Sequence, residues 1–165
     1  SLLEPALNDA VVHVIAMRRA EGRHLVADFE TRLKTLADMK AEIVRLAPEV
    51  VPAMREHLQK KIDDLKRTAS LPDVDPQRIA QEVALLAERA DIEEELTRFD
   101  AHLAQFAQLL KADEPAGRKL DFLVQELNRE ANTMGSKTPS SAITHLVVEL
   151  KSEIERIREQ VQNVR

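Results

Sequence analysis

The chain has 165 residues, of which 32% are charged and 44% hydrophobic, and its formal net charge is −5. This composition is typical of a soluble globular protein and excludes an intrinsically disordered one. No apolar run approaches the ~20 residues that cross a bilayer, and no signal-peptide pattern opens the chain. Cysteine is absent, which excludes disulfides and thiolate chemistry and fits a cytoplasmic location.

Charge and aromatic content both argue against a nucleic-acid-binding protein. Domains that bind nucleic acids are usually basic, whereas this chain is acidic. Its aromatic residues are four phenylalanines, so few rings are available to stack on bases. Taken alone, the composition favours a helical interaction module. The chain begins at Ser1 and not at methionine, from which we expect a processed or truncated product.

Apolar residues at helical spacing predict a long first helix. Its apolar positions are Leu7, Val11, Val14, Met17, Leu25, Phe29, Leu36 and Ile43. Pro48 is expected to end this helix, and Pro52 suits the first turn of a second helix that continues to Leu65. The two helices are expected to pack antiparallel, as a hairpin arm over residues 1–72.

A compact helical domain is expected over residues 73–165. Asp75 fits an N-cap and Pro76 fits the first helical position, after which the apolar pattern continues without a break to about Lys111. The segment "GRKLDFLVQELNREANTM" predicts a further helix, which Gly135 is expected to close in the left-handed conformation.

The last predicted helix has the most regular apolar pattern, with steps of four and three residues. Its apolar positions are Ile143, Val147, Leu150, Ile154, Ile157, Val161 and Val164. Such a heptad seam packs knobs into holes against another helix, either within the chain or in a second subunit. We therefore predict an all-α protein: a long antiparallel helical hairpin arm, then a compact helical domain with a C-terminal heptad-patterned helix.

The segment "RADIEEELTRFDAH" places four polar residues on the shoulder of the apolar face of its predicted helix. They are Asp91, Glu95, Arg98 and His102. A divalent cation held by Asp91 and Glu95, one turn apart, would offset the repulsion among the acids, with His102 as a ligand or proton carrier. The same four residues also fit an intrahelical ladder of ion pairs that needs no metal.

The next predicted helix carries a second polar stripe, at positions i, i+4, i+7 and i+11. Its members are Asp121, Gln125, Asn128 and Asn132. Amides compete with the backbone for hydrogen bonds, so a stripe of them indicates a partner. That partner is either the Glu95 and Arg98 edge of the preceding helix or a cleft in which arginines bind phosphate oxygens. No metalloprotease, P-loop or nucleophile-elbow motif is present.

Three segments of the chain resemble the C-terminal region of the YicC/YloC family of bacterial proteins. They are "LLAERADIEEELTRFDAH", "GRKLDFLVQELNREANTMGSK" and "VVELKSEIERIREQVQN". The resemblance runs from about Glu82 to the end of the chain. It implies a cytoplasmic, metal-dependent endoribonuclease that cleaves single-stranded RNA and assembles as a ring-like hexamer. Family members also carry an N-terminal half, roughly as long as this chain, that is missing here.

The resemblance directs attention to matching positions, and their roles are assigned from chemistry. Mg²⁺ or Mn²⁺ is expected at Asp91, Glu95 and Glu126. Catalytic roles are expected for Glu95, Arg98, His102 and Glu126, with His102 as the proton carrier. RNA contacts are expected from Arg118, Lys119, Arg129 and Lys137. The residues expected to orient these groups are Asp121, Gln125, Asn128, Glu130 and Asn132.

Two alternatives stay open. An attack by the RNA 2′-hydroxyl, assisted by His102, needs no metal. In another class, the chain is a non-catalytic helical assembly or RNA-adaptor module, and its polar stripes are structural. Replacement of Glu95 separates these classes, because a catalytic site loses cleavage while a structural network loses stability.

Overall fold

The computed structural model describes residues 3–69, 75–112 and 116–163, with side chains over 7–68, 75–112 and 116–162. These ranges contain five helices: α1 (Leu3–Ala69), α2 (Pro76–Arg89), α3 (Glu93–Leu109), α4 (Gly117–Lys137) and α5 (Ser141–Asn163). No strand occurs in them, so the predicted all-α class is confirmed. None of the described helices combines the length and the apolarity that a membrane span requires.

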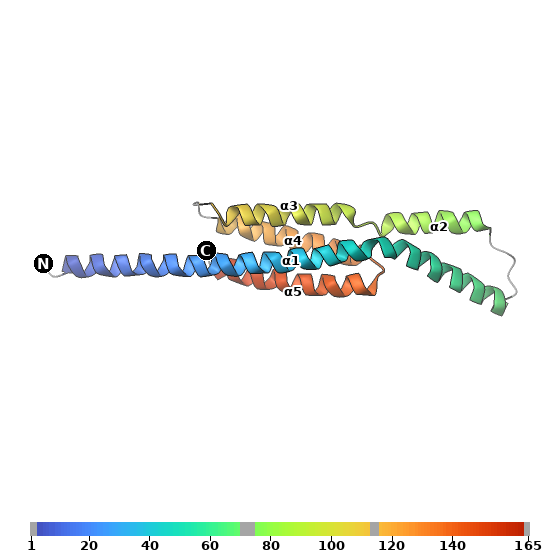
Figure 1. Ribbon diagram of the computed structural model, residues 1–165, viewed down its shortest axis with the longest axis horizontal. Helices are drawn as coiled ribbons and strands as arrows, with labels where there is room; N and C mark the ends of the chain where they lie inside the picture. The colour runs from blue at the N-terminus through green and yellow to red at the C-terminus, as the bar shows by residue number, and fades with distance from the viewer. Residues whose placement is uncertain (1–2, 70–74, 113–115, 164–165) are drawn as a thin grey trace.

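A central segment of α1 packs with α3, α4 and α5 into one elongated bundle (Figure 1). Each helix contributes one apolar stripe to a common core. Across this core Phe29 of α1 meets Phe106 of α3 edge to face, with ring centroids 5.5 Å apart and an interplanar angle of 72°. The predicted compact helical domain is confirmed, and its core includes part of the long helix that precedes it. The predicted boundary between residues 72 and 73 lies outside the described residues and stays a prediction.

Helix α1 runs through Pro48 and Pro52, so the predicted end of the first helix at Pro48 is wrong. Val50, between the two prolines, is buried in the core, and this packing keeps the segment helical. Prolines inside a helix remove a hydrogen bond and bend it, and α1 bends in its last third (Figure 1). The chain reverses only after Ala69, and α2 then runs back alongside α1.

The first part of α1 extends beyond the bundle (Figure 1). Its apolar residues are exposed: Leu7 is 68% and Met17 67% exposed. The buried face of α1 begins further along, at Phe29, which is 1% exposed. Helical spacing was therefore predicted correctly here, but no described helix covers the apolar side.

Helices α2 and α3 are separate, so the predicted unbroken helix from Pro76 to about Lys111 is wrong. The start of α2 is as predicted: Asp75 Oδ1 accepts a hydrogen bond from the Gln77 backbone N–H at 2.9 Å. The break follows Arg89, and Asp91 Oδ1 accepts the backbone N–H of Glu93 at 2.9 Å. This bond satisfies one of the free donors at the start of α3.

Helices α4 and α5 pack closely. The seam of α5, from Ile143 to Val161, is buried inside the chain, so it closes within the subunit; Val164 lies outside the described residues. Helix α4 continues past Gly135, and the predicted left-handed closure at that residue is wrong. A Cβ at Gly135 would lie 3.0 Å from Val147 Cγ1, so the missing side chain lets the two helices approach.

Candidate metal centre between α3 and α4

Polar side chains line one edge of the interface between α3 and α4. His102 on α3 neighbours the buried Leu103, and Glu126 and Glu130 on α4 precede and follow the buried Leu127 in the sequence. Residues four apart in a helix lie on the same face, so both carboxylates point to the same side of α4. Packing of the apolar stripes thereby brings the two carboxylates and the imidazole to one place.

His102, Glu126 and Glu130 each offer a ligand atom, and these atoms lie within 4.8 Å of one another. His102 and Glu126 are half-buried, whereas Glu130 is 3% exposed. Imidazole nitrogen and carboxylate oxygen are ligands that divalent cations such as Mn²⁺ accept in proteins. Over the described part of the chain, this is the one group of three or more such residues with metal-ligand spacing.

Two groups of this site make no hydrogen bond or ion pair with a described residue. Glu130 is one: the residue is 3% exposed, but its carboxylate oxygens are not among the fully enclosed, unpartnered atoms of the described structure. His102 is the other: its Nδ1 is buried and has no hydrogen-bond partner among these residues. A buried charge is normally paired or coordinates a metal, because its desolvation costs several kcal/mol. The donor set and the two unpartnered groups therefore fit a divalent cation.

Glu126 is more open than Glu130, with a side chain that is 22% exposed. Its nearest described cation is Arg129, whose Nη1 lies 3.5 Å from Glu126 Oε2. The Arg129 side chain is 68% exposed. The pair is long for a charge-assisted hydrogen bond and solvated, so it restrains Glu126 only weakly.

Glu95 lies outside the group of three. Its Oε1 accepts a hydrogen bond from Lys137 Nζ at 2.8 Å, which links α3 to the end of α4. Its Oε2 is buried and has no hydrogen-bond partner in the part of the chain that is described. Lys137, predicted to contact RNA, is thus paired with Glu95, which was predicted to be catalytic. Both roles stay predictions.

Asp91 and Arg98 do not join the stripe in which they were predicted. Asp91 lies before α3, whose N-cap is Ile92, and its Oδ1 accepts the backbone N–H of Glu93, so Asp91 is not part of the helix that carries Glu95. Arg98 pairs with Glu94 on the exposed side of α3. The ion-pair ladder predicted among Asp91, Glu95, Arg98 and His102 is therefore not formed. An acid-rich first turn, Glu93–Glu95, was the sequence signal for a helix start here.

The amide stripe of α4 is satisfied along its own helix. Gln125 Nε2 donates to Asp121 Oδ2 at 3.2 Å, and Asn132 Nδ2 donates to Asn128 Oδ1 at 2.9 Å. These amides do not bridge to the Glu95 edge of α3. Their predicted role in orienting a metal site stays a prediction, and the side chain that the structure adds to the ligand group is Glu130.

The remaining predicted RNA contacts, Arg118 and Lys119, are exposed in the first turn of α4. They border an open hollow of about 440 Å³ between the end of α3 and the start of α4. Sequence reasoning missed this hollow, and it assigned Glu130 to an outer shell. The signal for Glu130 was available: Glu126 and Glu130 are two acids one turn apart, flanking an apolar position.

Comparison with known proteins places the chain in a family. A family model described as "Endoribonuclease YicC-like, C-terminal" matches residues 37–165. A probable endoribonuclease YicC of Clostridioides difficile (strain 630) is 43% identical over 164 residues, which cover 99% of this chain and 55% of the relative. A probable endoribonuclease YicC of Haemophilus influenzae (strain ATCC 51907 / DSM 11121 / KW20 / Rd) is 41% identical over 159 residues, covering 96% and 54%. The chain spans about half the length of these curated relatives.

As the resemblance of its motifs predicted, the chain belongs to the YicC-like endoribonuclease family and matches its C-terminal domain.

Proposed function

We propose that the chain forms the metal-binding part of an endoribonuclease that cleaves single-stranded RNA. The names of the two relatives support RNA cleavage in general. One observation carries the proposed metal dependence: the ligand atoms of His102, Glu126 and Glu130 lie within 4.8 Å of one another, and His102 Nδ1 is buried without a hydrogen-bond partner among the described residues. Mg²⁺ and Mn²⁺ are the ions that this oxygen-rich donor set suits.

In this proposal His102, Glu126 and Glu130 are the ligands. When bound, a divalent cation neutralises charge on phosphate oxygens and lowers the pKa of a coordinated water. Glu130 is held rigidly by its burial in the helix interface, and Glu126 is the ligand on the open side. Arg129, largely exposed beside Glu126, is placed to donate hydrogen bonds to a phosphate of the bound strand.

Further parts of the proposal come from the family resemblance and from the length of the relatives. They are a homo-oligomer, with a ring-like hexamer as the expected form, and a cytoplasmic location. Because the chain covers 55% of one relative and 54% of the other, we also assign part of the RNA contacts to the half of the relatives that it does not cover. This assignment accounts for the acidic net charge of the chain.

The decisive experiment compares wild type, Glu130→Gln and a matched control, Glu30→Gln, whose carboxylate is exposed on α1. Cleavage of end-labelled single-stranded RNA is measured with Mn²⁺ and with EDTA, in the full gene product and in the 165-residue chain. Thermal melts are recorded for each protein. We expect wild type and Glu30→Gln to need the metal, and Glu130→Gln to lose at least ~10³-fold in rate, about 4 kcal/mol, with an unchanged or higher melting temperature.

Three results contradict the proposal. If cleavage persists in EDTA, the reaction needs no cation, as in the attack by the 2′-hydroxyl. If Glu130→Gln melts lower but cuts RNA normally per folded molecule, Glu130 is structural. Absence of cleavage in every protein, with RNA binding intact, supports the non-catalytic adaptor instead.

A further inference from the structure

One of the four phenylalanines differs from the others in its surroundings. Phe29, Phe99 and Phe106 are 1%, 0% and 0% exposed, whereas Phe122 is 57% exposed. The chain has no tryptophan or tyrosine, so every other aromatic ring lies in the core. Full burial of a phenylalanine contributes roughly 1.5–3 kcal/mol, and Phe122 forgoes part of it. The ring of Phe122 is therefore available to a ligand.

Phe122 lines the open hollow of about 440 Å³ between the end of α3 and the start of α4. Leu109 and the buried Leu123 give this hollow an apolar surface. Gln105 and Gln108 of α3 bring two side-chain amides to its wall. An apolar surface, one aromatic face and a few amides are what a planar heterocycle with hydrogen-bonding edges requires.

Two cations lie at the rim of the hollow in the described structure. Arg118 and Lys119 lie in the first turn of α4, which contains no acidic residue. The N-cap residue Ala116 makes no side-chain hydrogen bond to the helix start. Backbone N–H groups at a helix start and an exposed arginine can together donate hydrogen bonds to a phosphate group, and Arg118 is exposed at the start of α4.

The hollow lies next to the candidate metal centre. Phe122 precedes Glu126 by four residues, one turn of α4, and Gln105 follows His102 by three residues on α3. One helical turn advances about 5.4 Å. This step is comparable with the spacing between neighbouring nucleotides of an extended strand. A strand whose phosphate reaches the metal centre can therefore place an adjacent base in the hollow.

We propose that the hollow bounded by Phe122, Gln105, Gln108 and Arg118 binds an unpaired nucleobase of the RNA strand, stacked on Phe122, with its phosphate at the start of α4. Stacking on one ring accepts any base, so the site contributes affinity for single strands and little sequence preference. The inference rests on the proposed function for the identity of the polymer.

The absence of tryptophan makes a site-specific test possible. In Phe122→Trp the indole at the hollow is the chain's sole tryptophan, which can be excited selectively, and a stacked base quenches it. The matched control is Val148→Trp, at an α5 position that is 60% exposed. Both are made in the Glu130→Gln background, with EDTA present, so that no RNA is cut. Single-stranded oligoribonucleotide should quench Phe122→Trp, while a fully paired duplex should not, and neither should quench Val148→Trp.

Affinity gives a second readout in the same background. We expect Phe122→Ala to weaken binding of the single strand about tenfold, within the range for loss of one stacked base. Phe122→Leu should weaken it nearly as much, because it keeps apolar surface but removes the ring. Phe122 is exposed, so melts of these variants should match that of the background protein.

The outcomes separate this inference from the proposed function. If Phe122→Ala binds RNA normally, or Phe122→Leu does, no base stacks in the hollow, while the loss of cleavage in Glu130→Gln still supports the metal centre. If the Phe122→Trp signal responds to protein concentration and not to RNA, the hollow binds a second copy of the chain. If the wild-type protein binds no RNA, both proposals fail.

Discussion

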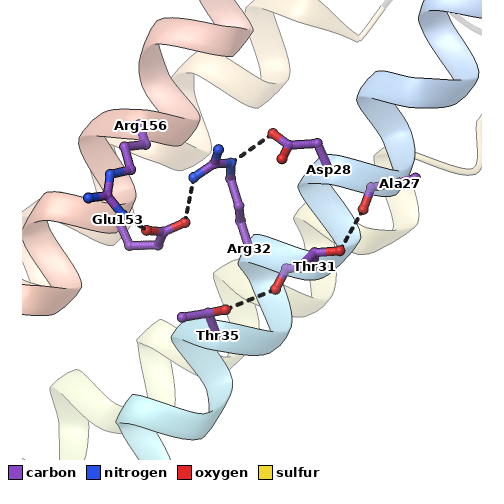
Figure 2. A network of polar contacts seen from close by, with 7 residues as sticks. All are labelled: Ala27, Asp28, Thr31, Arg32, Thr35, Glu153 and Arg156. Atoms are coloured by element: carbon purple, nitrogen blue, oxygen red, sulfur yellow. Dashed lines mark hydrogen bonds and ion pairs between the residues drawn. The ribbon is translucent and has the colours of Figure 1, made fainter.

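Two buried glutamates of this bundle have opposite surroundings. At the α1–α5 contact Glu153, 7% exposed, accepts hydrogen bonds from Arg32 Nη1 at 2.7 Å and Arg156 Nη1 at 2.8 Å (Figure 2). Arg32 Nε also donates to Asp28 at 2.7 Å. At the α3–α4 contact Glu130, 3% exposed, has no such cation in the described structure.

The comparison separates two uses of a buried carboxylate. A carboxylate with two guanidinium partners has its charge balanced by the chain itself, so its role is to fix two helices in register. Hydrogen bonding to Asp28, followed by Glu153, raises the pKa of Arg32 above its ordinary value against the opposing effect of burial. Glu130 lacks this balance, and we therefore assign the missing positive charge to a bound cation.

The largest expected effect is on the rate of RNA cleavage, at the candidate metal centre that contains Glu130. His102→Gln removes one ligand nitrogen, and we expect cleavage to fall about 100-fold or more at low Mn²⁺, about 2.7 kcal/mol, with partial recovery at high Mn²⁺. The measurement is the cleavage rate as a function of Mn²⁺ concentration. His145→Gln is the control, because His145 is exposed on α5 beside Glu149. Equal rates for the two variants would remove His102 from the site.

The next largest effect is on stability, at the Glu153 carboxylate whose charge is balanced by two arginines. Arg32→Met leaves Glu153 with Arg156 alone, and we expect the free energy of unfolding to fall by about 2 kcal/mol, less than the 3–5 kcal/mol for a fully unpaired buried charge. Urea denaturation measures this change. Arg156→Met, at a side chain that is 63% exposed, should cost less than about 1 kcal/mol. Loss of cleavage per folded molecule in Arg32→Met would contradict a purely structural role.

Added metal should stabilise the protein through Glu130 and not through Glu153. At Mn²⁺ ten times above its Kd, we expect the free energy of unfolding of wild type to rise by about 1.4 kcal/mol. The increase should vanish in Glu130→Gln and persist in Glu153→Gln. Urea curves with and without Mn²⁺ give both values. An equal increase in all three proteins would place the ion elsewhere.

The smallest effect concerns a carboxylate that is paired but solvated. Glu42 accepts hydrogen bonds from Arg45 on α1, which lowers the pKa of Glu42 below its ordinary value. A lowered pKa means that the stabilisation is present above the unfolded-state pKa and is lost as pH falls through the folded-state pKa. We expect Arg45→Gln to return the pKa of Glu42 to its ordinary value in an NMR titration, without a detectable change in melting temperature at neutral pH. A clearly lower melting temperature would show that solvation does not weaken such pairs here.

Local signals predicted much of the fold. The start of α2 at Asp75 and Pro76 and the heptad seam of α5 were correct, because caps and periodicity act within one or two turns. The prolines of α1 were misread, since a proline bends a helix whose surroundings hold it together. The break before α3 was missed, because apolar spacing continues across Asp91 and Ile92.

The candidate site was predicted in part. His102 and Glu126 were among the predicted site residues, and the structure brings them together with Glu130. Asp91 was placed with Glu95 by extending one helix through both, whereas Asp91 lies in the break between α2 and α3 and outside the helix that carries Glu95. Helical geometry relates residues along one element, whereas a ligand group needs two elements, and their relative position follows from core packing.

The sequence by itself determined the helical class, the apolar stripes and the chemical groups available at the edges of each stripe. It did not distinguish Glu130 from Glu153, since both lie beside apolar residues in amphipathic helices. Only the tertiary structure did so, because the cation that balances Glu153 comes from Arg32, 121 residues away, and α3 offers Glu130 a histidine instead. The charge balance of a buried group depends on what packs against it, and that partner is set by the whole bundle.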